Sequence, residues 1–153
     1  MRGMRLLMSI RQVDGPDLTA ADVYAIWKIR DVVFAVEQRC DEPDVDDLDL
    51  LATTTHLWFA DDDGPTSYLR VLTDPDGARR VGRVATRVDS RRGGLAGQLV
   101  AEVTRLWGDG VLRLNAQAHL ENWYERFGYR RSGPNFVEAS IDHVPMQRPA
   151  GRS

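Results

Sequence analysis

Seven residues between a predicted strand and a predicted helix have the composition of an anion-binding loop. The segment from 91 to 97 reads Arg-Arg-Gly-Gly-Leu-Ala-Gly. The start of a helix presents free backbone N–H groups and the positive end of the helix dipole, and glycines let a ligand approach the backbone closely. We therefore predict a phosphate site here. An ordinary tight turn between strand and helix is the alternative.

The glycine spacing excludes two well-known nucleotide loops. A Walker A loop is excluded because no Gly-Lys-Ser/Thr follows the glycines, and the GxGxxG pattern fails because Gly93, Gly94 and Gly97 stand at other intervals. Arginine suits phosphate because it forms paired hydrogen bonds. Six arginines, which could also be solvated charges at a strand edge, lie within 79–92: Arg79, Arg80, Arg83, Arg87, Arg91 and Arg92.

An acidic segment precedes most of the predicted strands. From Glu37 to Asp49 the chain has seven acids and one base, Arg39. This density would attract a cationic amine, and it equally fits a solvated loop. An EF-hand is excluded because a loop starting at Asp44 lacks the required glycine and final glutamate. One cysteine, Cys40, and three scattered histidines offer too few sulfur and imidazole ligands, so we predict no metal site.

Patterns of apolar residues predict the elements that position these segments. Thr19 and Asp22 resemble a capping box, and the helix after them is expected to run to about Val36. Strands are expected at 6–11, 55–60, 67–72, 81–88 and 111–116, with a hairpin signal at Asp63-Gly64. The glycine-rich loop opens a helix whose apolar stripe has near-ideal spacing. A second apolar helix face, at 120–127, ends at Gly128.

This order of elements predicts an α/β or α+β domain around a mixed sheet. The strand–loop–helix–strand unit from Val81 to Ala116 should make its two strands parallel neighbours. The length of 153 residues suits a single domain over 1–153. We expect residues 1–4 and 148–153 to be frayed.

Composition excludes several classes of protein. The net charge of −3 argues against chain-wide nucleic-acid binding. The longest stretch without a charged side chain, Leu50 to Ala60, is too short to span a bilayer, and the apolar run Leu6 to Ile10 is too short for a secretory signal. We therefore predict a cytoplasmic protein with no membrane or nucleic-acid partner, and we leave a homodimer open.

Several motifs together resemble the GNAT acetyltransferase superfamily. The segment Arg91–Ala96 fits its Arg/Gln-x-x-Gly-x-Gly/Ala signature, and AQAHLENWYERFGY, from Ala116 to Tyr129, is similar to its second motif. Further segments resemble the ElaA-like subgroup: Arg30–Cys40, the Asp44/Asp46/Asp49 cluster, Gly82–Val84 and Ile141–Met146. The chain departs from that subgroup at 139–143, where Ala-Ser-Ile-Asp-His replaces Asp-Gly-Ile-Pro-His.

The resemblance implies a sheet splayed at an acetyl-CoA site. Its loop would hold the pyrophosphate, and backbone groups near Val84, Ala85 and Thr86 would pair with the pantetheine arm and bind the oxyanion. Tyr124 would lie beside the CoA sulfur and protonate the departing thiolate, although its apolar helix face also fits a core residue. Gln117 would touch the cofactor or cap a helix. The implied cofactor-binding residues are Val84, Ala85, Thr86, Arg91, Arg92, Gly93, Gly94, Leu95, Ala96, Gly97 and Gln117.

Acetyl transfer also requires a group that takes the proton of the amine. Glu37 is our hypothesis for this base, and a capping or loop-anchoring role is an equal alternative. Asp44, Asp46 and His143 are expected to bind the acceptor. We predict an N-acetyltransferase that moves acetyl from acetyl-CoA to a primary amine of a small molecule or peptide, by direct attack in a ternary complex. A non-catalytic acyl-CoA-binding module and a nucleotide-binding enzyme are the alternatives.

Overall fold

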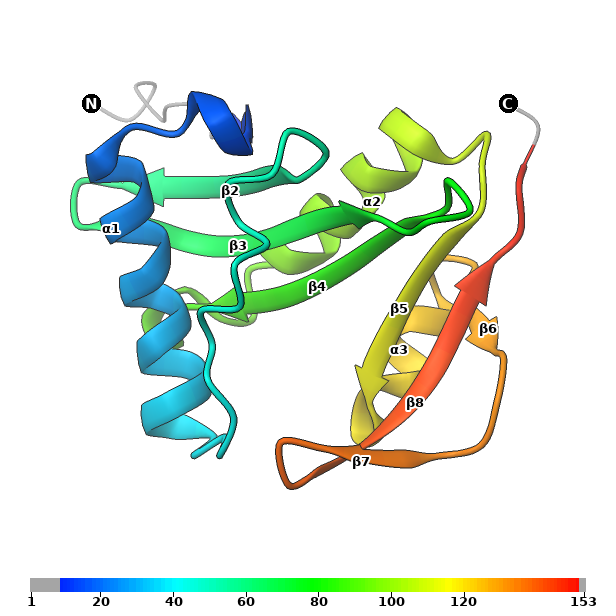
Figure 1. The fold of residues 1–153 in the computed structure, drawn as a ribbon. Helices are drawn as coiled ribbons and strands as arrows, with labels where there is room; N and C mark the ends of the chain where they lie inside the picture. Colours follow the sequence, from blue (N-terminus) through cyan, green and yellow to red (C-terminus); the bar gives the residue numbers. More distant parts are fainter. Residues whose placement is uncertain (1–8, 152–153) are drawn as a thin grey trace.

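Eight strands form one open, mixed sheet in the computed structural model, which describes residues 9–151 (Figure 1). The order is β1-β2-β3-β4-β5-β8-β6, and β7 pairs with the amino-terminal end of β8. Among the strand pairs within residues 9–151, only β4 and β5 are parallel, which confirms the predicted parallel pairing of these two strands. The strands are β1 Arg11–Asp14, β2 Thr55–Asp61, β3 Gly64–Thr73, β4 Arg79–Thr86, β5 Leu112–Gln117, β6 Arg130–Arg131, β7 Phe136–Glu138 and β8 Ile141–Arg148.

Helices cover both faces of this sheet (Figure 1). Helix α1, Ala20–Arg30, continues as a π-helical segment, Asp31–Glu37, and packs Ile26 and Ile29 against Trp58 and Tyr68 on one face. Helix α2, Leu95–Trp107, and the short helix α3, Glu121–Glu125, lie over the opposite face. Because side chains alternate along a strand, neighbouring residues of β3 enter different cores: Tyr68 faces α1, and Leu69 and Val71 face α2.

Local signals explain how the helices begin. Thr19 Oγ1 accepts a hydrogen bond from the Asp22 amide at 3.0 Å, and Asp22 accepts one from the Thr19 amide at 3.1 Å, which confirms the capping box. Helical structure then runs to Glu37, close to the predicted end. In α2 the predicted stripe is buried at Leu99 and Val103, which lie in the main core.

Two expectations about the strands require correction. The first strand lies at Arg11–Asp14, and residues 6–8 of the expected one lie outside the described residues. Strand β4 ends at Thr86 and not at Val88, because a 3-10 turn, Val88–Ser90, follows it. At the carboxyl end, Arg148 still belongs to β8, and the Gly151 amide donates to the Gly108 carbonyl at 2.9 Å. Arg148 and Gly151 thus have backbone partners, and the other ends expected to fray, residues 1–4 and 152–153, lie outside the described residues.

Candidate active site

The sheet opens at its parallel pair. Strands β4 and β5 share three register pairs, the last of them Val81 with Leu114, and then diverge (Figure 1). A bulge in β4 contributes to this opening: Tyr68 pairs with Ala85 and Arg70 with Gly82, so that Arg83 and Val84 together oppose Leu69. Beyond the bulge, the β5-facing edge of β4 makes no ladder with β5 in residues 9–151. The splay expected from the sequence is therefore present.

A cavity of about 850 Å³ lies at this opening. Both diverging strands contribute to its wall, through Val84 and Thr86 on β4 and Gln117 on β5. Ala85 does not border it, because its side chain is buried with Tyr68 on the α1 face. A volume of this size is typical of small-molecule and cofactor sites.

The glycine-rich loop forms one end of the cavity. Most of its residues border the space: Arg91, Arg92, Gly94, Leu95, Ala96 and Gly97. Gly94 caps α2 with φ of +78°, and a Cβ at this position would meet no other atom within 4 Å, so the space beside Gly94 is open. The first backbone N–H groups of an α-helix have no partner within the helix. Gly93 is outside the lining, and Gly97 lies against α3, where a Cβ would come within 3.2 Å of Phe127. The loop thus has the geometry of an anion site.

Tyr124 lies in the wall of the cavity and at the edge of the core. Its ring packs edge-on against Trp123, with centroids 4.8 Å apart, and against Tyr129 at 6.2 Å. The side chain is 5% exposed and borders the cavity. Burial raises the pKa of Tyr124 well above its ordinary value, so the phenol keeps its proton at neutral pH. Tyr124 is therefore a core residue by packing and a candidate proton donor by position.

Glu37 has a different environment from the one expected. Its Oε1 accepts a hydrogen bond from Arg91 Nη2 at 2.5 Å, and the residue does not border the cavity. This ion pair joins the end of the π-helical segment to the glycine-rich loop. These contacts fit the loop-anchoring role that the sequence left open as the alternative for Glu37.

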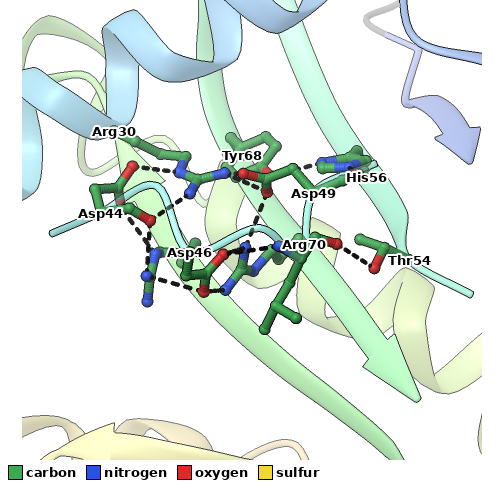
Figure 2. A network of polar contacts seen from close by, with 10 residues as sticks. Arg30, Asp44, Asp46, Asp49, Thr54, His56, Tyr68 and Arg70 are labelled. Atoms are coloured by element: carbon green, nitrogen blue, oxygen red, sulfur yellow. Dashed lines mark hydrogen bonds and ion pairs between the residues drawn. The ribbon is translucent and has the colours of Figure 1, made fainter. Parts of the chain in front are cut away.

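The acidic segment is mostly engaged by arginines of neighbouring elements (Figure 2). Asp44 pairs with Arg30 at 2.8 Å, and Asp46 pairs with Arg70. Asp49, which is 6% exposed, accepts from Arg30 at 2.6 Å and from Arg70 at 2.9 Å. Burial opposes ionisation of Asp46, but the hydrogen bond and charge of Arg70 outweigh it and lower its pKa to about 2. Asp44 and Asp46 do border the cavity, yet their charges are compensated.

Further contacts anchor this network inside the protein (Figure 2). His56, which is fully buried, bonds the Tyr68 hydroxyl through Nδ1 at 2.7 Å and the Asp49 carbonyl through Nε2 at 2.8 Å. Burial lowers the pKa of His56, which favours the neutral ring. Asp44, Asp46 and Asp49 are consequently bound to the body of the protein, whereas Asp41, Glu42 and Asp47 are exposed, as in the solvated loop that composition also allowed.

Two predicted residues on the far wall have defined partners. Gln117 Nε2 donates to Gln38 Oε1 at 2.9 Å, so the side chain bridges to the segment after α1 and makes no helix-cap bond. His143 borders the cavity, and its Nδ1 lies 2.7 Å from the Ile141 carbonyl. Since a carbonyl only accepts, Nδ1 carries a proton and the lone pair of the neutral ring is on Nε2. Phe136 stacks on the ring at 5.6 Å.

Sequence reasoning missed the partners of the acidic segment. Arg30 interrupts an apolar helix stripe and is completely buried, and Arg70 lies in a strand that otherwise reads as core. A charged residue inside an apolar pattern is a signal that it has a buried partner, and it was available at both positions. Gln38, which also borders the cavity, carried no such signal.

Two features are absent from the described part of the chain. Within residues 9–151, no cluster of His, Cys, Asp or Glu is arranged to hold a metal ion. No helix in that range has the length and apolar character needed to cross a membrane.

A parallel pair that splays at a bulge, with a glycine-rich helix start at one end of the resulting cavity, defines an acyl-CoA N-acyltransferase fold. The model of the acetyltransferase (GNAT) domain matches residues 35–149. The chain belongs to this GNAT family and is ElaA-like within it.

Relatives and solved structures agree with this assignment. A UPF0039 protein of Mycobacterium tuberculosis is 39% identical over 145 residues, covering 92% of this chain and 93% of the relative. Escherichia coli ElaA is 33% identical over 138 residues, covering 86% and 90%. The crystal structure of an acyl-CoA N-acyltransferase from Pseudomonas aeruginosa has a TM-score of 0.83 at 36% identity, covering 92% and 99%, and that of E. coli ElaA has 0.84 at 29%, covering 93% and 99%.

Proposed function

We propose that this protein is an N-acetyltransferase that moves an acetyl group from acetyl-CoA to a primary amine. The observation that carries the proposal is the cavity between β4 and β5, which has the start of α2 at one end and Tyr124 in its wall. The backbone N–H groups after Gly94, with Arg91 and Arg92, would hold the pyrophosphate. The unladdered edge of β4 after the bulge would pair with the amide-containing pantetheine arm.

The proposed reaction is a direct attack within a ternary complex. The amine attacks the thioester carbonyl carbon, a backbone N–H within 84–86 donates to the tetrahedral oxyanion, and the C–S bond then breaks. Tyr124 gives its proton to the departing thiolate, a role supported by its position in the wall of the cavity. Once the C–N bond has formed, the nitrogen releases its surplus proton to the base, and the Tyr124 phenolate takes a proton back from solvent. The CoA thiol and the acetylated amine then leave, so atoms and charge balance.

Glu37 remains our proposal for the group that takes this proton, directly or through water. Its ion pair with Arg91 means that a base role requires the carboxylate to exchange partners. On the acceptor side, Asp44, Asp46 and His143 border the cavity, which supports contact with a small-molecule or peptide amine. Because the two aspartates are paired, we expect them to act by hydrogen bonding and shape more than by a net negative field.

Binding of acetyl-CoA tests the proposal at its carrying observation. A ligand that binds only the folded state raises the melting temperature by mass action. Acetyl-CoA should therefore raise the Tm of the parent, and Gly94→Asp should abolish that rise by placing bulk and negative charge where the pyrophosphate would lie. A rise that survives in this variant would contradict the phosphate assignment. ATP or NAD stabilising the protein in place of acetyl-CoA would favour a nucleotide-binding enzyme.

A non-catalytic acyl-CoA-binding module on the same fold is the second candidate. Tyr124 is packed in the core and also borders the cavity, so its position fits a purely structural role as well, and this observation favours the second candidate. Such a module would bind acetyl-CoA but release no CoA in the presence of any amine.

A further inference from the structure

Arg83 has a backbone conformation that is unusual for its place in the fold. Its φ is +53°, and it lies within β4, whereas the other non-glycine residues of positive φ in the described chain lie in loops and turns. A residue with a Cβ rarely adopts this region, and such a conformation persists only where its surroundings hold it. The residue is also the first of the two in the β4 bulge.

The acidic segment supplies the contacts that hold Arg83. Its Nε lies 2.7 Å from Asp44 Oδ1, and its Nη2 donates to the Asp44 carbonyl at 2.9 Å and to Asp46 Oδ2 at 3.3 Å. One guanidinium thus meets two carboxylates and one backbone oxygen of the same segment. These contacts connect the bulge to residues about forty positions earlier in the chain.

The two aspartates are themselves fixed from other elements. Arg30, on α1, holds Asp44, and Arg70, on β3, holds Asp46. Both arginines are almost fully buried, and Arg70 is the register partner of Gly82, next to the bulge. Arg83 is therefore held, through the two aspartates, from α1 and from β3. The network balances three arginines, Arg30, Arg70 and Arg83, with three aspartates, Asp44, Asp46 and Asp49. Figure 2 shows its part around Arg30 and Arg70.

The residues that follow Arg83 carry the groups needed for catalysis under the proposed function, on which this inference rests. An oxyanion donor is effective only if it is held in place before the reaction. A change in φ at position 83 would redirect the N–H groups of 84–86, two of whose residues border the cavity. We propose that Arg83 is a positioning residue, clamped by Asp44 and Asp46, that fixes the oxyanion donor of β4.

This role makes different predictions from direct binding of the acceptor by Asp44 and Asp46. Loss of a contact with the acceptor would raise the acceptor KM. Loss of a clamp on the oxyanion donor would instead lower kcat and weaken polarisation of the thioester carbonyl, with little effect on the affinity for acetyl-CoA. Carbonyl polarisation can be measured without knowing the acceptor.

The test uses Arg83→Asn, because asparagine tolerates positive φ but lacks the guanidinium. Arg39→Asn is the matched control: Arg39 has φ of +55°, is exposed and forms no ion pair within residues 9–151. The first readout is the infrared band of acetyl-CoA labelled with ¹³C at its carbonyl. Binding to the parent should move this band to lower wavenumber, and Arg83→Asn should lose most of that shift while Arg39→Asn keeps it.

Affinity and turnover complete the test. The calorimetric Kd for acetyl-CoA should be nearly unchanged in Arg83→Asn. With an amine that the parent accepts, kcat should fall by about tenfold, less than the 10²–10³ typical of deleting an oxyanion donor outright, because the donor is displaced but present. The acceptor KM should hold. Asp46→Asn removes the ion pair between Asp46 and Arg83 and leaves Arg70 paired with Asp49. It should reduce the carbonyl shift and kcat in the same direction as Arg83→Asn, but by less.

Each outcome has one meaning. If Arg83→Asn and Asp46→Asn both keep the carbonyl shift and kcat, the positioning role is refuted. If they raise the acceptor KM and leave kcat and the carbonyl shift unchanged, the positioning role is refuted and the segment serves acceptor binding alone. If Arg83→Asn does not fold, the Asp46→Asn carbonyl shift decides. Failure of the parent to bind acetyl-CoA would instead overturn the proposed function itself.

Discussion

We predict that removing one carboxylate from the buried ion network destabilises this domain measurably, because the arginines that it pairs with stay buried. Asp49 is 6% exposed, and its Oδ1 accepts from Arg30 at 2.6 Å and from Arg70 at 2.9 Å. Asp49→Asn keeps the size and one acceptor oxygen but leaves three arginines facing two carboxylates. Removing one partner of a buried pair costs about 3–5 kcal/mol, and we expect the lower end because Asp44 and Asp46 still pair with the two arginines.

Urea unfolding followed by tryptophan fluorescence measures this loss, since Trp58 is buried beneath α1. A loss of about 3 kcal/mol corresponds to a fall in Tm of about 6–12 °C for a domain of this size. Asp109→Asn, at an exposed turn position, is the control and should stay within about 0.5 kcal/mol of the parent. Adding Arg30→Met to Asp49→Asn removes the surplus cation, so the double variant should lose less than the sum of the two single variants. The reasoning is refuted if Asp49→Asn unfolds at the same urea concentration as the control.

Three further predictions concern catalysis and acid stability. Tyr124→Phe should lower kcat by about 100-fold with an unchanged Kd for acetyl-CoA, and an unchanged kcat would make Tyr124 a core residue only. Glu37→Gln should lower the maximal rate and alter its pH profile; if both stay the same, Glu37 serves only to anchor Arg91. The pKa of Asp46 is lowered to about 2 in the folded state, so its stabilisation is complete above the ordinary value and is lost as pH falls from about 4 to 2. The free energy of unfolding of Asp46→Asn should therefore fall less steeply than that of the parent over this range, by about 1 kcal/mol after allowance for solvent screening.

Much of the fold was predictable because local signals govern it. The capping box at Thr19, the apolar stripe of α2 and the parallel pairing of β4 and β5 are consequences of short-range spacing and of chain handedness. The glycine-rich start of α2 was visible in the same way, and Gly94 has the left-handed φ that favours glycine.

The rest depends on partners that lie far apart in sequence. Nothing in the spacing of Asp44 indicates that it meets both Arg30 and Arg83, which are 14 and 39 positions away. The charge density of the segment was visible, but its compensation was not, because side-chain pairing between elements depends on register and on the bulge. The strand pairing of Arg148 was missed for the same reason, since its partner Leu112 is distant in the chain.

Release of CoA thiol on addition of an amine tests the central claim most directly. The parent should bind acetyl-CoA and, across a panel of primary amines, release thiol in step with a product that is heavier by one acetyl group. Gly94→Asp should lose this activity through its affinity for acetyl-CoA, and Tyr124→Phe should lose it through kcat. If the parent binds acetyl-CoA tightly but no amine of the panel yields product or thiol, the chain is an acyl-CoA-binding module and the proposed transferase activity is wrong.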